Sequence, residues 1–494
     1  MTRRLRFGLS LAGSAFAFGI CLIILRVWQG PCGYDVYYYA LQTKALTLEG
    51  ELLFSDHSLV YRVLYLVNLL LNNPILSVQV LASFCIALLF FCLLAASFRT
   101  GASLYKTAVA VIAIFNPGTF YLLLEFTKNN FAFALFFLAW LLLTDEENRL
   151  LFNSANHRPP VRLFSGLLIL CIAVLSHRLI LALLLCFIAQ KLFVFLLPRF
   201  KKEKILIICA AIAAVLSVVA FIFLGKMILE RLEFIGPGAF VHRFVQLFRS
   251  PLLKSERIFY ITLQISVFFL IPYIAIKDKW LNKSCLVFAA TGWLFLFPFL
   301  HFTWDGLGFR LLILAPVMLA PAFMQMRPRF PKVIAMILIV ASIWFTSESV
   351  QHLAFDKGPD YRAYKETFKS IEAMVKGRRL IVHRGLAGFL WYEKGIRSEN
   401  FRPLDGEDRY LRMVYAFSPE IFESYLEADD PMPLSVNNTY TLMEEKIWQR
   451  FYRDRQDLFF LKSELNPFLP RPVSGFVINE KIAALLSPVS DFPE

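Results

Sequence analysis

Apolar runs of membrane-spanning length, separated by short charged loops, constrain this chain more than any other feature. A helix needs about 20 apolar residues to cross the ~30 Å hydrocarbon core of a bilayer. The hydrophobic fraction of 58% excludes a soluble enzyme and a disordered chain. The sequence therefore predicts an α-helical polytopic membrane protein with about 11 transmembrane helices. The runs lie near residues 7–27, 75–98, 107–124, 130–143, 163–176, 179–197, 205–224, 258–276, 284–300, 311–325 and 333–350.

Lys and Arg residues gather in alternate loops and predict the orientation. One set of loops carries 18 basic residues against five acidic ones, and such an excess marks the cytoplasmic side. The run Ser58–Leu71 is predicted as a helix on the membrane surface, because a twelfth span would reverse every later loop. The 18 residues are Arg3, Arg4, Arg6, Arg99, Lys106, Arg149, Arg158, Arg162, Arg199, Lys201, Lys202, Lys204, Lys277, Lys279, Lys283, Arg327, Arg329 and Lys332.

The charge balance changes near residue 350. Residues 351–494 hold 20 basic and 22 acidic residues, whereas residues 1–350 hold 31 and 15. We therefore divide the chain into a transmembrane core, residues 1–350, and a C-terminal domain, residues 351–494. With eleven spans in a bacterial-type inner (plasma) membrane, the C-terminal domain is extracytoplasmic. It lacks the basic face with stacking aromatics that nucleic-acid binding needs.

The C-terminal domain is expected to be a small α/β domain. Tyr361–Val375, Pro419–Leu426 and Met443–Arg453 predict helices, and Arg379–His383 predicts a short buried strand. No phosphate loop or nucleophile elbow occurs there. No Cys/His/carboxylate spacing in the whole chain specifies a metal site, and no cofactor is identified.

The first outer loop carries the most informative motif, Gly33-Tyr34-Asp35-Val36-Tyr37-Tyr38-Tyr39. Asp35 immediately precedes a predicted helix whose apolar spacing suits a helix resting on the membrane surface. Asp35 is then either the N-cap of that helix or a general base at the membrane surface, where a hydroxyl acceptor meets a lipid-borne donor. Asp56 is a candidate second acidic group. The apolar spacing is that of Tyr38, Leu41, Ala45 and Leu48.

This loop, with Ala-Leu repeated four residues after Ala40-Leu41 and then Glu49-Gly50, resembles the first outer loop of GT-C superfamily glycosyltransferases. These multi-span enzymes use polyprenyl-phosphate-linked sugars and include protein O-mannosyltransferases and aminoarabinose transferases. Leu124–Asn130, Ser176–Leu179 and Trp304–Arg310 resemble outer junctions of the same family. The resemblance covers most of residues 1–350 in arrangement, but residues match only in short motifs. The WWDYG signature of oligosaccharyltransferases is absent from residues 351–494, which argues against an N-linked oligosaccharide transferase.

The resemblance implies a direct displacement in which Asp35 is the base that activates the acceptor hydroxyl. Cationic residues at outer span ends would hold the donor phosphate. Each of these charges has a simpler reading as a helix-end snorkeller or as part of an ion pair such as Glu125 with Lys128. The implied partners are a polyprenyl-phosphate sugar donor, membrane lipids and a glycan, lipid or protein acceptor. The phosphate-binding candidates are Lys128, His177, Arg178, His242, Arg243 and Arg310, with Glu125 and Asp305 as further candidates.

A secondary transporter or flippase for an anionic or lipid-linked substrate is the main alternative. Such a protein places ionisable residues near the bilayer midplane, in broken and repeated helices. Here the charges gather at one face instead, and no internal repeat is evident. A purely structural membrane scaffold leaves the outer charges unexplained.

Overall fold

The structure is a computed structural model of the 494-residue chain. The structure describes residues 3–27, 35–53, 56–99, 103–124, 126–144, 160–196, 254–267, 284–296, 307–326, 330–351, 379–382, 390–395, 439–444 and 476–479. Some predictions lie outside these residues, among them the span at 205–224 and the helices at 361–375 and 419–426.

The chain divides into two compact units. One, here called the helical unit, comprises Met1–Ile24, His57–Arg62 and Val80–Asp356. The other, here called the loop–tail unit, comprises Leu25–Asp56, Val63–Gln79 and Lys357–Glu494. The first outer loop and the C-terminal residues therefore belong to the same unit. The domain boundary that charge places at residue 350 stays a prediction.

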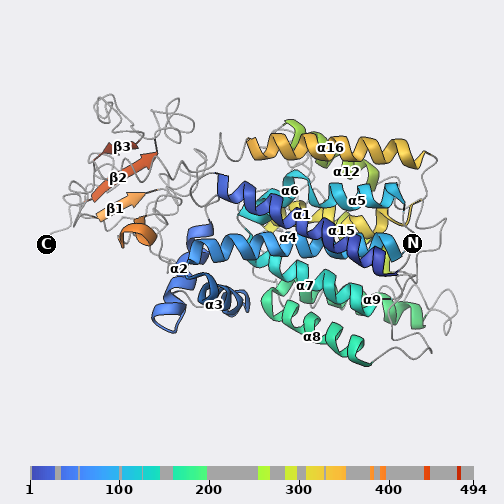
Figure 1. Cartoon of the computed structure of the whole chain (residues 1–494), viewed down its shortest axis with the longest axis horizontal. Helices are drawn as coiled ribbons and strands as arrows, with labels where there is room; N and C mark the ends of the chain where they lie inside the picture. Colours follow the sequence, from blue (N-terminus) through green and yellow to red (C-terminus); the bar gives the residue numbers. More distant parts are fainter. Residues whose placement is uncertain are drawn as a thin grey trace, which may run out of the picture. The chain divides into compact units, whose positions relative to one another are not determined.

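The helical unit consists of apolar helices that lie side by side (Figure 1). Three segments, Arg4–Arg26, Pro74–Arg99 and Pro331–Val350, are each long and apolar enough to cross a membrane. The chain is therefore a membrane-embedded helical protein, and eleven spans stay a prediction. The helices are α1 (Arg3–Val27), α4 (Pro74–Arg99), α5 (Leu104–Ile114), α6 (Pro117–Leu124), α7 (Thr127–Leu143), α8 (Pro160–Ser176), α9 (Arg178–Leu196), α12 (Lys254–Ile265), α14 (Ser284–Phe295), α15 (Leu307–Phe323) and α16 (Pro331–Gln351). The end of α1, residues 25–27, and the start of α4, residues 74–79, belong to the loop–tail unit.

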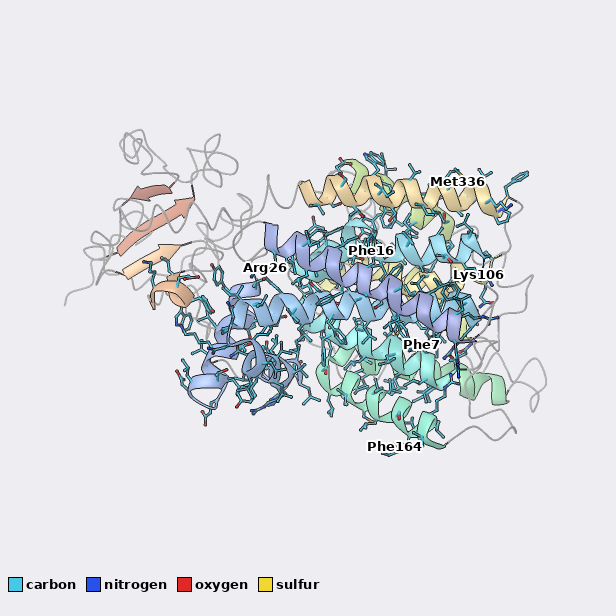
Figure 2. All side chains as sticks on the ribbon, in the orientation of Figure 1. Phe7, Phe16, Arg26, Lys106, Phe164 and Met336 are labelled. Carbon is cyan, nitrogen blue, oxygen red and sulfur yellow. The ribbon has the colours of Figure 1, made fainter. Side chains whose placement is uncertain are left out.

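Exposed apolar side chains line the outside of the helical unit. Phe16 on α1, Phe164 on α8 and Met336 on α16 are 67%, 68% and 65% exposed (Figure 2). Water solvates such surfaces poorly, whereas lipid tails are as apolar as these side chains, and helices satisfy their own backbone groups inside a bilayer. These three helices therefore present lipid-facing surfaces.

The core of the helical unit surrounds α15, whose residues 311–322 are all buried. Helices α14, α5 and α6 pack against it. Gly292 on α14 permits this approach, because a Cβ there would meet Leu319 Cδ2 at 2.5 Å. Phe288 of α14 packs against Phe137 and Trp140 of α7, with ring centroids 5.3 and 5.1 Å apart.

The apolar run predicted as a span at 107–124 forms two helices, α5 and α6, which meet at an angle of 47°. Pro117 begins α6, and a proline inside a continuous helix removes an N–H and clashes with the preceding turn. Asn116 satisfies the interrupted backbone. Its Nδ2 donates to the carbonyl of Ala113 at 2.7 Å, and its Oδ1 accepts from the N–H of Gly118 at 2.9 Å.

The helix predicted after Asp35 is present as α2 (Asp35–Leu48). Protein rather than lipid covers most of its predicted apolar face, and its position at the membrane surface stays a prediction. Leu41 and Ala45 are buried, and of the predicted apolar face only Leu48 is exposed. An amphipathic pattern has the same form whether lipid or protein lies against it.

Helix α3 (Val60–Leu71) occupies the run predicted as a surface helix. Leu66, Leu69 and Leu70 are exposed along it. Asn72, at a φ of 47°, ends the helix in the left-handed region, and Asn73 Oδ1 accepts from the N–H of Leu76 at the start of α4. Its place at the membrane surface stays a prediction.

Three short strands form one sheet in the loop–tail unit: β1 (Arg379–Val382), β2 (Thr439–Glu444) and β3 (Phe476–Asn479). The order is β1-β2-β3, with β1 and β2 parallel and β2 and β3 antiparallel. Strand β1 coincides with the strand predicted at Arg379–His383.

The helix predicted from Met443 is wrong at its start, because Met443 and Glu444 belong to β2. The β-branched and aromatic residues before them favour a strand. The remainder of that predicted helix lies outside the described residues, and the α/β domain as a whole stays a prediction.

Candidate functional site

Arginine side chains bind backbone carbonyls at one end of the helical unit, here called the arginine end. Carbonyls in the last turn of a helix have no partner within the helix and carry partial negative charge. The loop count predicts all three arginines on one side of the membrane, and the structure brings them to one end. Arg6 donates to Phe98 O at 3.2 Å, Arg99 donates to Leu141 O, and Arg162 donates to Leu141 O at 3.0 Å and to Thr144 O at 3.1 Å.

The opposite end, here called the polar end, carries Ser58, Ser83, Thr127–Asn130, Ser176 and His177. Helices α7 and α8 pack against each other, and the start of α8 meets the end of α7 through Arg162. The start of α7 and the end of α8 therefore share the polar end. Ser58 Oγ donates to Ser176 O at 2.8 Å, and Asn130 Nδ2 donates to Ala82 O at 3.0 Å.

The first turn of α7 is the most unusual part of the polar end. Its N-cap residue, Phe126, makes no side-chain capping hydrogen bond. The first N–H groups of a helix lack partners within the helix and carry partial positive charge. Lys128, which is half-buried, adds a full positive charge in the same turn. This turn therefore favours an anion.

Buried polar atoms surround this turn. A buried polar atom that lacks a hydrogen bond lowers the free energy of unfolding by about 1–3 kcal/mol. The polar end therefore has hydrogen-bonding capacity that the described side chains do not use. Among the described residues, Thr127 Oγ1, Asn129 Nδ2, Asn130 Oδ1 and Ser83 Oγ are buried without a hydrogen-bond partner.

His177, at the turn between α8 and α9, has a structural contact. Its Nδ1 accepts a hydrogen bond from the N–H of Leu179 at 3.2 Å, at the start of α9. This hydrogen bond occupies Nδ1 and ties His177 to the first turn of α9.

The other predicted site residues are described only in part. Asp35 is the first residue of α2, and Asp56 is half-buried; both belong to the loop–tail unit. Of the predicted residues, the structure brings Lys128 and His177 to one end of the helical unit. Glu125, His242, Arg243 and Asp305 lie outside the described residues, as do the side chains of Asp35, Arg178 and Arg310.

Sequence reasoning singled out the segments Leu124–Asn130 and Ser176–Leu179 but did not name the neutral polar residues of this end as site candidates. Ser58 and Ser83 carry no charge, and their neighbours come from distant parts of the chain. Thr127, Asn129 and Asn130 interrupt a long apolar stretch, which is the signal that marks them. Among the described residues, no three His, Cys, Asp or Glu side chains form a group that could hold a metal ion.

Comparison with known proteins adds no relative. No known family model matches the chain, and no curated protein matches its sequence. The resemblance to GT-C glycosyltransferases therefore rests on the short motifs of residues 1–350 and on their order along the chain.

Proposed function

We propose that the chain is an integral membrane glycosyltransferase. It transfers a sugar from a polyprenyl-phosphate-linked donor to an acceptor at the outer face of a bacterial-type inner membrane. The observation that carries this proposal is the first turn of α7, at the end opposite the arginine end. This turn has no side-chain cap, contains Lys128 and lies among buried polar side chains. The order of the outer-loop motifs supports it independently.

The chemistry of the donor fits this turn. A lipid phosphate carries negative charge and several acceptor oxygens, and its charge grows as the sugar leaves. Helix N–H groups and a nearby ammonium stabilise such charge. Lys128 and His177 would contact the phosphate, together with Arg178, His242, Arg243 and Arg310.

Asp35 would act as the base that accepts the proton of the acceptor hydroxyl. It begins α2, which is a buried helix. A base must be held in one geometry to act, because misplacement by an ångström costs large factors in rate. A buried helix supplies that rigidity better than a mobile loop.

A transporter or flippase is the second candidate, and the bent pair α5–α6 favours it, because transporters coordinate substrates at broken helices. At this break, however, Asn116 satisfies the interrupted backbone itself. Ser342 Oγ donates to the carbonyl of Phe115 at 2.6 Å. The polar groups of the break are thus occupied by the protein, which argues for a structural bend.

The test is sugar transfer by purified full-length protein with radiolabelled polyprenyl-phosphate mannose and polyprenyl-phosphate aminoarabinose, tried separately. We expect Asp35→Asn to lower the rate roughly 100- to 10,000-fold while donor binding survives, because an amide cannot accept the proton. Glu51→Gln, at an exposed carboxylate of the same unit, is the matched control. Unchanged transfer by Asp35→Asn removes Asp35 from the mechanism. Vesicle transport without cleavage of the sugar–phosphate bond supports the transporter instead.

A further inference from the structure

Within the loop–tail unit, a short segment of the C-terminal region, residues 390–395, contacts the first outer loop. Residues 390–395 are described, and Leu390 is fully buried. Tyr392 lies in this segment and meets α2 at two positions, Tyr37 and Lys44. These two residues are seven apart and therefore share one face of the helix. The contact joins residues 348 positions apart in the sequence.

Each part of Tyr392 has a different partner. Its ring lies against the ring of Tyr37, with centroids 5.6 Å apart and planes tilted by 49°. Lys44 Nζ stands 5.2 Å from the centroid of the same ring and donates to the Tyr392 carbonyl at 3.4 Å. The aromatic pair and the cation–π contact each stabilise this arrangement.

The phenolic oxygen of Tyr392 reaches a third element. It accepts a backbone hydrogen bond from Ile75, in the first turn of α4. The N–H groups of this turn have no acceptor within the helix, so the phenol supplies one. Burial, reinforced by the nearby Glu393 carboxylate, raises the pKa of Tyr392 to about 12, so the phenol is neutral at physiological pH.

We infer that Tyr392 is a positioning residue, which holds α2 against the start of α4 and thereby fixes the helix end that carries Asp35. This inference rests on the proposed function. Tyr37, which Tyr392 contacts, lies two residues after Asp35 and is fully buried. The C-terminal region thus contributes to transfer through the geometry of the first outer loop.

The first measurement is hydrogen–deuterium exchange of peptides covering residues 35–48 in the full-length protein in lipid nanodiscs. Tyr392→Ala removes the ring contacts and the phenol, and we expect α2 amides to exchange roughly tenfold faster. Tyr392→Phe keeps the ring and should retain most of the protection. Tyr65→Ala is the matched control, because Tyr65 is a half-buried tyrosine of the same unit.

Unchanged exchange of α2 in Tyr392→Ala overturns the inference. Peptides of α15 serve as an internal reference, because general unfolding would raise their exchange as well. If Tyr392→Ala does not accumulate, Lys44→Met takes its place. This variant keeps the side-chain stem but loses both ammonium contacts, so faster exchange of α2 supports the inference and unchanged exchange overturns it.

The second measurement is sugar transfer from the same two lipid-linked donors. A misplaced base lowers kcat and leaves the KM for the donor nearly unchanged. We expect this pattern for Tyr392→Ala, with recovery in Tyr392→Phe. If α2 amides exchange faster in Tyr392→Ala but kcat is unchanged, the positioning role is overturned. If the wild-type chain transfers no sugar but α2 amides exchange faster in Tyr392→Ala, the proposed function is contradicted. The Tyr392 contact is then still established.

Discussion

The starts of α5 and α7 lie at opposite ends of the helical unit and are built differently. Both carry a half-buried lysine in the first turn, Lys106 in α5 and Lys128 in α7. At the arginine end, Ser103 caps α5, and its side chain accepts from the N–H of Lys106 at 3.2 Å. Figure 2 labels Lys106 at this end. At the polar end, Phe126 precedes α7 without a side-chain cap.

This difference separates structural from functional use of the same chemistry. At the arginine end, side chains of the protein complete the helix termini, and their hydrogen bonds stabilise the fold. At the polar end, α7 has no side-chain cap, and several buried polar atoms lack a hydrogen-bond partner among the described residues, which suits the proposed ligand. A protein retains such a costly arrangement where a ligand offsets it. The two lysines therefore make a matched pair for experiment.

The largest effect in this comparison is expected for donor use. Lys128→Met should lower kcat/KM for the lipid-linked donor about 10- to 100-fold, because a charged hydrogen bond to phosphate contributes about 1.5–3 kcal/mol. Lys106→Met should change it less than about twofold. Transfer assays on the two purified variants check this. Equal losses in both would remove the functional distinction between the ends.

The next effect is on stability at the arginine end. Arg162→Met should lower the free energy of unfolding by about 1.5–3 kcal/mol, because its guanidinium donates to two carbonyls at the end of α7. Lys332→Met is the control, since Lys332 is exposed. Denaturant unfolding in detergent micelles measures both. A loss no greater than that of the control would show that these contacts contribute little.

A smaller effect concerns the cap of α5. Ser103→Ala should lower the free energy of unfolding by about 1 kcal/mol, because the N–H of Lys106 loses its acceptor. Ser103→Asn can replace the acceptor and should restore most of the loss. The same unfolding measurement applies. If Asn and Ala behave alike, the cap is not what stabilises this helix start.

The last test measures labelling rather than stability and asks which side each end faces. His57→Cys marks the polar end and Ser103→Cys the arginine end, and both residues are exposed. We expect a membrane-impermeant maleimide to label position 57 in cells with a permeabilised outer membrane. Position 103 should react only after lysis of the inner membrane. The wild-type chain, which keeps its native cysteines, measures the background labelling. The reverse pattern would invert the proposed orientation.

Much of the helical unit follows from the sequence alone, because backbone groups in a bilayer must bond within their own segment. Apolar runs therefore become helices, as α4 and α16 do at the predicted positions. The grouping of Arg6, Arg99 and Arg162 at one end also follows from loop charge. The bend at Asn116-Pro117-Gly118 carried a readable signal in its proline and glycine.

Only the tertiary structure decided which apolar surfaces face protein. Helices α15 and α16 are both mostly apolar, yet residues 311–322 are buried while Val333, Met336 and Val340 are exposed. Lipid and protein interiors are equally apolar, so hydrophobicity cannot tell these environments apart. Close packing depends instead on shape, as at Gly292 against Leu319. The burial of α2 and its contact with Tyr392 have the same origin, because side chains 348 positions apart become neighbours only through the fold.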